Sequence, residues 1–253
     1  YTVLELRCAD VIMITTADDE IVPTAKAIAE TVALKPGTII FHCSGLLSSK
    51  ELRKVLPSGI VLASLHPVKS FADPARAVNS FSGTYCVLEG DERAVTFLEG
   101  LVSKLNGIAL PLSAADKATT DSTVAESKAL YHSGVVFASN YIVAMLDVAL
   151  AAVTNVGIDR EVARKMLCSI ASGVVENVLH DDTADALTGP VKRGDLATVV
   201  AHLEALKSMG KSYPLIYKMC GCRILELLER ENSAGVANSA VHKQLKEIFS
   251  VND

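Results

Sequence analysis

Residues 10–41 read DVIMITTADDEIVPTAKAIAETVALKPGTIIF and carry the pattern from which the fold can be inferred. Val11–Thr15 is a short β-rich run that stops at polar residues, as a buried parallel strand does. Ile21–Leu34 has apolar residues at helical spacing, and Lys35-Pro36-Gly37 is a helix stop signal. Thr38–Phe41 is apolar and β-rich again. The stretch therefore predicts a strand, a helix and a second strand in succession.

The same alternation continues further along the chain. Helices are expected at Ser48–Val55 and Asp91–Leu105, and strands at Gly59–Leu65, Thr84–Leu88 and Gly107–Leu112. Strands and helices in alternation form right-handed βαβ units on a mostly parallel sheet. This part of the chain is therefore predicted to be α/β.

After residue 112 the strand signals cease and helical periodicity takes over. Helices are predicted at Asp116–Ala152, Arg160–Leu179, Leu196–Met209, Pro214–Glu231 and Val236–Ile248. The change predicts two domains, an α/β domain at residues 1–112 and an all-α domain at residues 113–253.

The composition fits a globular protein that acts on small molecules. Half of the 253 residues are hydrophobic and 21% are charged, which is enough to bury a substantial core. The formal net charge of -5 is small and has the wrong sign for binding a phosphate polymer. We therefore expect a small-molecule substrate and no nucleic acid.

The cysteines indicate reduced thiols in the cytoplasm. Six are present, and a chain with a full core does not need disulfides. Cys220 and Cys222 are separated by one residue, a poor match to zinc-site spacing, so no metal is expected. The opening residues have neither the basic region nor the apolar core of a signal peptide.

One stretch, Gly134–Val156, is apolar enough to suggest a membrane span. Asn140, Asp147 and Asn155 interrupt it, however, and Ser and Ala are frequent. A helix buried on most sides inside a helical domain or a dimer explains the stretch better. We therefore expect no membrane contact.

Candidate ligand-binding residues follow the first two strands. In an open parallel sheet, ligands bind outside the carboxyl ends of the strands. Thr15, Thr16, Ala17 and Asp18 follow the first strand, and Ser44-Gly45 follows the second. Glycine lets the backbone approach a ligand closely, although an ordinary strand-to-helix turn explains this pair equally well.

Three further positions could carry chemistry. His66 ends a strand before Pro67 and could bind a substrate, or it could be a structural histidine. Lys128 and His132 lie one helical turn apart and suit proton transfer to a carbonyl or imine. A solvated lysine and a core histidine are the alternative for this pair.

The loop before the helix predicted at residues 196–209 contains another candidate. Arg193 could bind a carboxylate or phosphate, or it could be a surface residue. Asp195 is expected to cap the amino terminus of the following helix.

Three separated motifs resemble a known family over nearly the whole chain. The motifs are Ser64-Leu65-His66-Pro67 with Ser70-Phe71-Ala72-Asp73-Pro74, Lys128-Ala129-Leu130-Tyr131-His132 with Ala138-Ser139-Asn140-Tyr141, and Ala186-Leu187-Thr188-Gly189-Pro190 with Arg193-Gly194-Asp195. They resemble the DUF2520-containing family of Rossmann-like NAD(P) oxidoreductases, which is related to pyrroline-5-carboxylate reductase and the β-hydroxyacid dehydrogenases. The resemblance implies a Rossmann-like parallel sheet and a helical domain like the carboxyl-terminal domain of 6-phosphogluconate dehydrogenase. It also implies a homodimer.

The resemblance implies roles for the candidate residues. Lys128 and His132 would be catalytic, although His132 stands where the related hydroxyacid enzymes have an amide. The substrate would be bound by His66, Asn140 and Arg193. NADP or NAD would lie at Thr15, Thr16, Ala17, Asp18, Ser44 and Gly45.

Hydride transfer between NADP or NAD and a small carbonyl, imine or hydroxy acid is the function that the resemblance implies. The sequence lacks the glycine-rich turn that binds pyrophosphate in this fold. We therefore expect the sheet to be incomplete at its amino-terminal side, by about 50 residues of a mononucleotide-binding half, and the chain to be a fragment. The alternative is a non-catalytic dinucleotide-binding module or a dimeric scaffold.

Overall fold

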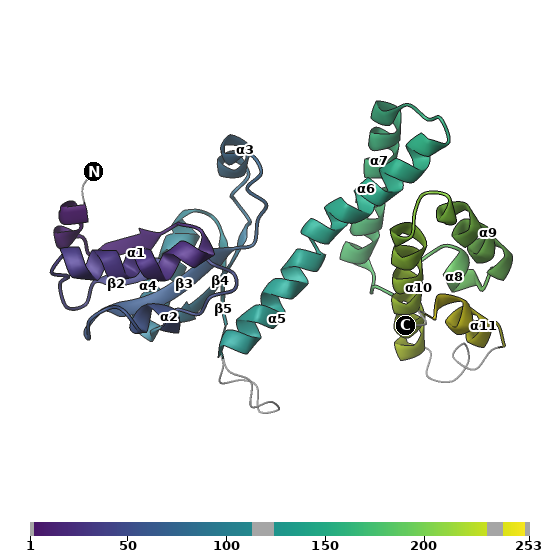
Figure 1. Ribbon diagram of the computed structural model, residues 1–253. Helices are drawn as coiled ribbons and strands as arrows, with labels where there is room; N and C mark the ends of the chain where they lie inside the picture. The colour runs from purple at the N-terminus through teal and green to yellow at the C-terminus, as the bar shows by residue number, and fades with distance from the viewer. Residues whose placement is uncertain (1–2, 113–123, 232–239, 251–253) are drawn as a thin grey trace. The chain divides into compact units, whose positions relative to one another are not determined.

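The computed structural model describes residues 3–112, 124–231 and 240–250 (Figure 1). The chain divides into two compact units, Tyr1–Tyr141 and Ile142–Asp253, each described below by itself. The division falls beyond the strands, so the first helix after them belongs with the sheet.

The first unit is built on a five-stranded sheet whose strand order follows the chain. The strands are β1 (Val11–Ile14), β2 (Ile39–His42), β3 (Val61–Pro67), β4 (Tyr85–Gly90) and β5 (Ile108–Pro111). β1, β2 and β3 pair in parallel, as do β4 and β5, which confirms the predicted mostly parallel sheet. β3 extends past its predicted end, so His66 lies inside the strand.

β3 and β4 pair in antiparallel fashion, which corrects the expectation of continuous βαβ units. The chain between them contains only the short helix α3 (Pro74–Asn79), capped by Asp73. Val68 already donates its N–H to the Tyr85 carbonyl at 2.8 Å, so β4 begins beside the end of β3. A parallel strand would need a crossover back along the sheet, and this connection makes none.

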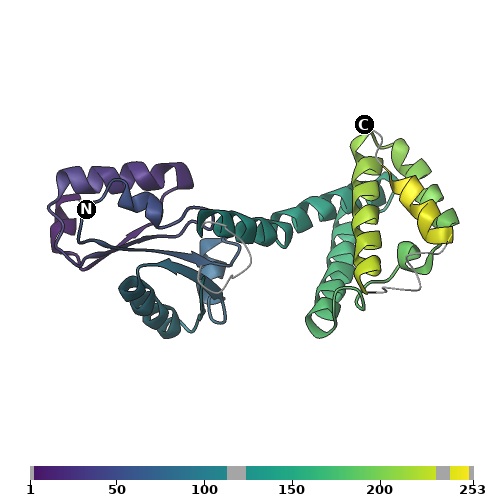
Figure 2. The ribbon, with the colours of Figure 1, turned by 90° about the horizontal axis from the view of Figure 1, so that it is seen from below.

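Helices cover both faces of the sheet (Figure 2). α1 (Asp18–Thr31) and α2 (Lys50–Arg53) pack on one face, and α4 (Glu92–Lys104) packs on the other. Side chains alternate along a strand, so Ile40 joins the core under α1 while Phe41 joins the core under α4. Each core aliphatic side chain contributes about 1.5–3 kcal/mol by leaving water. A short 3-10 helix, η1 (Val3–Cys8), precedes β1.

The helix predicted at residues 116–152 is two helices, α5 (Val124–Phe137) and α6 (Asn140–Asn155), with a break at Ala138 and Ser139. Residues 116–123 of that prediction lie outside the described residues, as do residues 236–239 of the last predicted helix. α5 belongs to the first compact unit.

The second unit is helical, as predicted. Its helices after α6 are α7 (Arg160–His180), α8 (Pro190–Arg193), α9 (Leu196–Lys207), α10 (Ser212–Glu231) and α11 (Ala240–Phe249). Val199, Leu225 and Phe249 belong to its buried core. Asp195 caps α9 as predicted, because its carboxylate accepts the N–H of Thr198 at 3.1 Å.

α6 and α7 expose much apolar surface. α6 contains no buried residue, and Val143 is 68% exposed. The segment Glu126–Asn155 is long and apolar enough to cross a membrane, with a mean hydropathy of 1.9. Length and composition alone are weak evidence for a span, since core and interface helices share them.

Candidate functional site

The loops that follow β1 and β2 meet at the carboxyl edge of the sheet. Ser44 Oγ, after β2, donates to Asp18 Oδ2 at 2.8 Å, at the beginning of α1. Thr15, Thr16 and Ala17 lead into that helix and are exposed. The two predicted loops therefore form one continuous edge.

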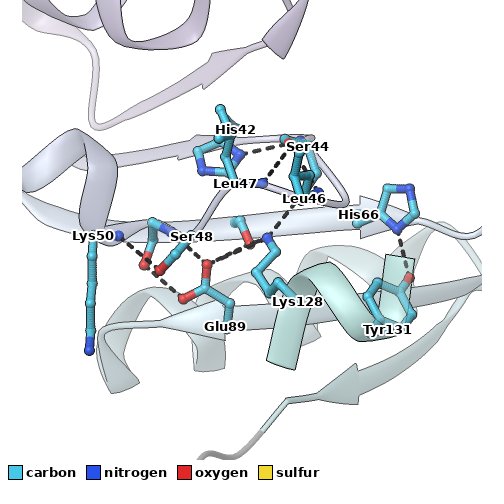
Figure 3. A network of polar contacts seen from close by, with 12 residues as sticks. His42, Ser44, Leu46, Leu47, Ser48, Lys50, His66, Glu89, Lys128 and Tyr131 are labelled. Carbon is cyan, nitrogen blue, oxygen red and sulfur yellow. Dashed lines mark hydrogen bonds and ion pairs between the residues drawn. The ribbon is translucent and has the colours of Figure 1, made fainter. Parts of the chain in front are cut away.

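Ser44 has every polar group engaged within the protein (Figure 3). Its N–H donates to His42 Nδ1 at 3.2 Å, and its carbonyl accepts from Lys128 Nζ at 3.1 Å. Its Oγ accepts the N–H groups of Leu46 and Leu47 at 3.1 and 2.8 Å. The Ser44 loop is therefore fixed by its own contacts before any ligand arrives.

Gly45 is a site of close approach, as its residue type suggested. A Cβ atom at this position would lie 2.4 Å from His132 Nδ1 and 2.9 Å from His66 Cε1. Any larger residue would have to displace at least one ring. The sequence predicted that a ligand approaches Gly45, whereas the described structure places two histidine rings of the protein there.

Lys128 is buried beneath the strand ends, not solvated. It projects from α5 and is 1% exposed. Its Nζ donates to Ser64 Oγ at 2.6 Å and to the Ser44 carbonyl at 3.1 Å, and lies 3.6 Å from Glu89 Oε1. Lys128 thus ties α5 to β2, β3 and β4.

Glu89 is the residue of this network that the sequence reasoning missed. It is 6% exposed on β4, and its carboxylate accepts from the N–H and Oγ of Ser49 at 2.6 and 2.9 Å. Ser64 Oγ also donates to it, at 2.8 Å. A carboxylate directly after the apolar run Cys86-Val87-Leu88 was the available signal, because a buried acidic residue needs a partner.

His66, Tyr131 and His132 form a second cluster beside Gly45. His66 Nδ1 and the Tyr131 hydroxyl share a hydrogen bond of 2.6 Å. The rings of His66 and His132 meet edge to face, with centroids 5.5 Å apart. Among the side-chain atoms that the structure describes, His132 Nδ1 and His42 Nε2 are buried without a hydrogen-bond partner.

Burial favours the neutral forms of His66 and His42. Desolvation, aided by the charges of His132 and Lys128, lowers the pKa of His66 to about 4. Desolvation and the Lys128 charge lower the pKa of His42 to about 4 as well. Burial raises the pKa of Tyr131 to about 12, so the bond between Tyr131 and His66 joins two uncharged groups at neutral pH.

Burial also lowers the pKa of Lys128, and the negative charge of Glu89 opposes that effect. Asp18 acts in the same direction as Glu89. The protonation state of Lys128 therefore depends on the balance between its desolvation and these carboxylates.

Two predicted substrate residues take no part in the hydrogen bonds described above. Asn140 is exposed at the start of α6, where its Oδ1 accepts from Ser139 Oγ at 3.0 Å. Arg193 is exposed at the end of α8 in the second unit. Both stay predictions.

All six cysteines are free thiols. Within the described ranges, no three His, Cys, Asp or Glu side chains gather closely enough to hold a metal ion.

The fold and these contacts can be compared with known proteins. A family model described as Domain of unknown function (DUF2520) matches residues 84–224. A protein from Thermotoga maritima is similar in structure, with a TM-score of 0.66 and 26% sequence identity over 87% of this chain and 78% of that one. No curated protein sequence matches the chain.

Two further solved structures show the same fold at lower identity. A Bacteroides fragilis protein, provisionally assigned as an NADP oxidoreductase, has a TM-score of 0.68 and 16% identity over 85% of this chain and 75% of its own. Plasmodium falciparum pyrroline carboxylate reductase, solved with NADP bound, has a TM-score of 0.54 and 14% identity over 96% and 79%. The predicted Rossmann-like sheet followed by a helical domain is thereby confirmed.

Proposed function

This chain belongs to the DUF2520 family, whose model covers more than half of it, and from its fold and the contacts at its sheet edge we propose that it is an NAD(P)-dependent oxidoreductase. The reaction would transfer a hydride between NADP or NAD and a small carbonyl, imine or hydroxy acid. The supporting observation is that α5 brings Lys128 and His132 to the carboxyl edge of the sheet, against Ser44 and Gly45.

The strand ends fit the nicotinamide end of a dinucleotide better than its phosphates. Thr15–Asp18 is exposed next to the Ser44 loop, and the rings of His66 and His132 cover the buried Gly45 of that loop. The Asp18 carboxylate would repel a phosphate but could accept a hydrogen from an amide or a ribose hydroxyl. We therefore place the nicotinamide and its ribose here, where the reduced cofactor, when bound, would supply the hydride.

The protein's own residues would handle the proton and orient the substrate. His132 is half-buried beside Gly45 and would hold or deliver the proton, with Lys128 as a positive charge behind the Ser44 loop. His66 would orient the substrate, its ring being held by Tyr131. Asn140 would bind the substrate through its side-chain amide.

Arg193 would grip an anionic substrate group, since its guanidinium is exposed and matches the fork geometry of a carboxylate. Replacing Arg193 by Lys should then weaken binding of an anionic substrate more than that of a neutral one.

NADPH and NADH binding tests the proposal. Fluorescence of the reduced nicotinamide and the thermal shift of the protein should both respond to one of them. Replacing His132 by Ala should abolish turnover while the cofactor still binds. No response to either dinucleotide would favour the alternative, a dimeric scaffold.

We further propose a homodimer formed through α6 and α7. Five apolar residues on α7 recur at intervals of four and are all more than 40% exposed: Val162, Met166, Ile170, Val174 and Val178. Soluble monomers rarely expose apolar surface of this extent, and such a ridge packs readily against another helix. A second copy of the chain is the occupant we propose, in place of a membrane.

We also propose where the two domains divide and in which compartment the protein acts. We place the boundary between the dinucleotide-binding and helical sequences at residue 112, with α5 packing back onto the sheet. The net charge of -5 argues against nucleic acid, and six free thiols favour the cytoplasm.

A further inference from the structure

Glu89 is a buried carboxylate for which the proposed reaction has no direct use. It lies on β4, which runs antiparallel to β3, and its pairing with Ser64 places it level with His42, the last residue of β2. The side chain is 6% exposed. Carboxylates are rarely buried to this extent unless paired, which suggests a specific task.

The hydrogen bonds around Glu89 are directional. Ser64 Oγ has a single proton, which it donates to Glu89 Oε1 at 2.8 Å. Its lone pairs are then free to accept from Lys128 Nζ at 2.6 Å. Glu89 thereby orients the Ser64 hydroxyl and, through it, the ammonium group of Lys128.

Lys128 connects the Glu89 hydrogen bonds to the strand ends. Its third contact is the Ser44 carbonyl, next to Gly45 and the two histidine rings. The other titratable groups that influence Lys128 or are influenced by it are Asp18, His42 and His66. Of the carboxylates, Glu89 is the buried one and the one in ion-pair contact.

Resting on the proposed function, we propose that Glu89 is a positioning residue of the redox site. It holds Lys128 as an ammonium ion aimed at the Ser44 carbonyl, and so fixes the loop against which the nicotinamide would lie. The positive charge of Lys128 and the geometry of the Ser44 loop then depend on a residue of β4 that touches neither substrate nor cofactor.

The test is the titration of Lys128, observed by NMR in protein labelled with carbon-13 at the lysine Cε atoms. The Lys128→Met variant assigns the signal. Glu89→Gln keeps the size of the side chain and one acceptor oxygen but removes its charge, so the Lys128 midpoint should fall by about 1–3 pH units. Glu92→Gln, an exposed change at the start of α4, should leave the midpoint in place. An unchanged midpoint in Glu89→Gln would overturn the proposal.

Whether the variants fold is a second test of the proposal. If Glu89→Gln does not fold, the double variant Glu89→Gln/Lys128→Met should fold, because it leaves no unpaired buried charge. Failure of the double variant as well would contradict the pairing.

NADPH affinity separates this proposal from the proposed function. Glu89→Gln should weaken NADPH binding by about tenfold, because a loop that is no longer preorganised must be ordered when the ligand binds. Glu92→Gln should bind like the unsubstituted chain, and equal affinity in Glu89→Gln would contradict the positioning role. A lack of NADPH binding by the unsubstituted chain would count against the proposed function alone, because the Lys128 titration does not depend on the dinucleotide.

Discussion

Gly45 is the residue at which the smallest change has the clearest expected effect. Gly45→Ala places a methyl group 2.4 Å from His132 Nδ1, so a ring or the loop must move. Overpacking of this kind costs about 1–3 kcal/mol of unfolding free energy. Gly134→Ala is the matched control, because nothing lies within 4 Å and alanine favours a helix by about 0.5–1 kcal/mol. Denaturant unfolding measures both.

A double variant that lacks the His132 ring tests whether this ring causes the loss of stability in Gly45→Ala. Gly45→Ala/His132→Ala should recover most of the stability that Gly45→Ala loses, relative to His132→Ala alone. Additive losses would show that the His132 ring is not what constrains Gly45.

His66 gives a pH dependence of stability. Its pKa is about 4 in the folded chain and about 6.5 when unfolded. Above pH 6.5 both states are neutral, and between about 6.5 and 4 the unfolded state binds the proton preferentially. Stability should therefore fall as pH falls through this window.

Unfolding curves at several pH values check this prediction. His66→Gln should show a shallower decline than the unsubstituted chain, with the remaining slope including the contribution of His42, whose pKa is also lowered to about 4. Parallel curves for the two proteins would contradict the assignment to His66.

At the scale of elements, the cap of α9 offers a separable test. Asp195→Ala removes the acceptor for the N–H and hydroxyl of Thr198 and should cost about 0.5–2 kcal/mol of unfolding free energy. Asp195→Ser should retain most of the stability, since serine is also a good cap. Thermal unfolding compares the variants. Equal loss in both would indicate that Asp195 is needed for something other than capping.

Local pattern was enough to predict most of these elements. The five strands and the long helices follow from apolar periodicity and stop signals, which act within a few residues. The short helices α3 and α8 have too few residues for a periodic signal, and the break between α5 and α6 at Ala138 and Ser139 contains neither the Gly nor the Pro that usually signals a helix end.

Other features depend on contacts between distant residues. The antiparallel pairing of β4 is set by where the connection from β3 runs, not by the sequence of either strand. The structure has Lys128 at the strand ends, but its partner Glu89 lies 39 positions earlier, and only the folded sheet brings the two together. For the same reason the sequence indicated Gly45 as a candidate but did not show that the rings of His66 and His132 leave no room for a Cβ atom at this position.

At the scale of the whole molecule, the apolar ridge on α7 predicts self-association. Ile170 is 66% exposed in the middle of that ridge, so Ile170→Glu should weaken the dimer by burying a charge. Ser172→Glu adds the same charge at a neighbouring exposed position and should leave the dimer intact. Sedimentation velocity measures the mass of each.

Two outcomes would contradict the dimer. The unsubstituted chain could sediment as a monomer at all concentrations, or it could bind phospholipid vesicles through α6 and α7. Vesicle binding would assign the exposed apolar surface to a membrane, consistent with the hydropathy of Glu126–Asn155.

The most direct measurement is NMR of the histidine side chains during titration with reduced nicotinamide mononucleotide, with ADP-ribose as the control. The mononucleotide should shift the imidazole signals of His66 and His132, and ADP-ribose should leave them in place, because the nicotinamide alone would lie at the strand ends. Shifts with neither compound, or equal shifts with both, would contradict a nicotinamide site formed by the strand ends and α5.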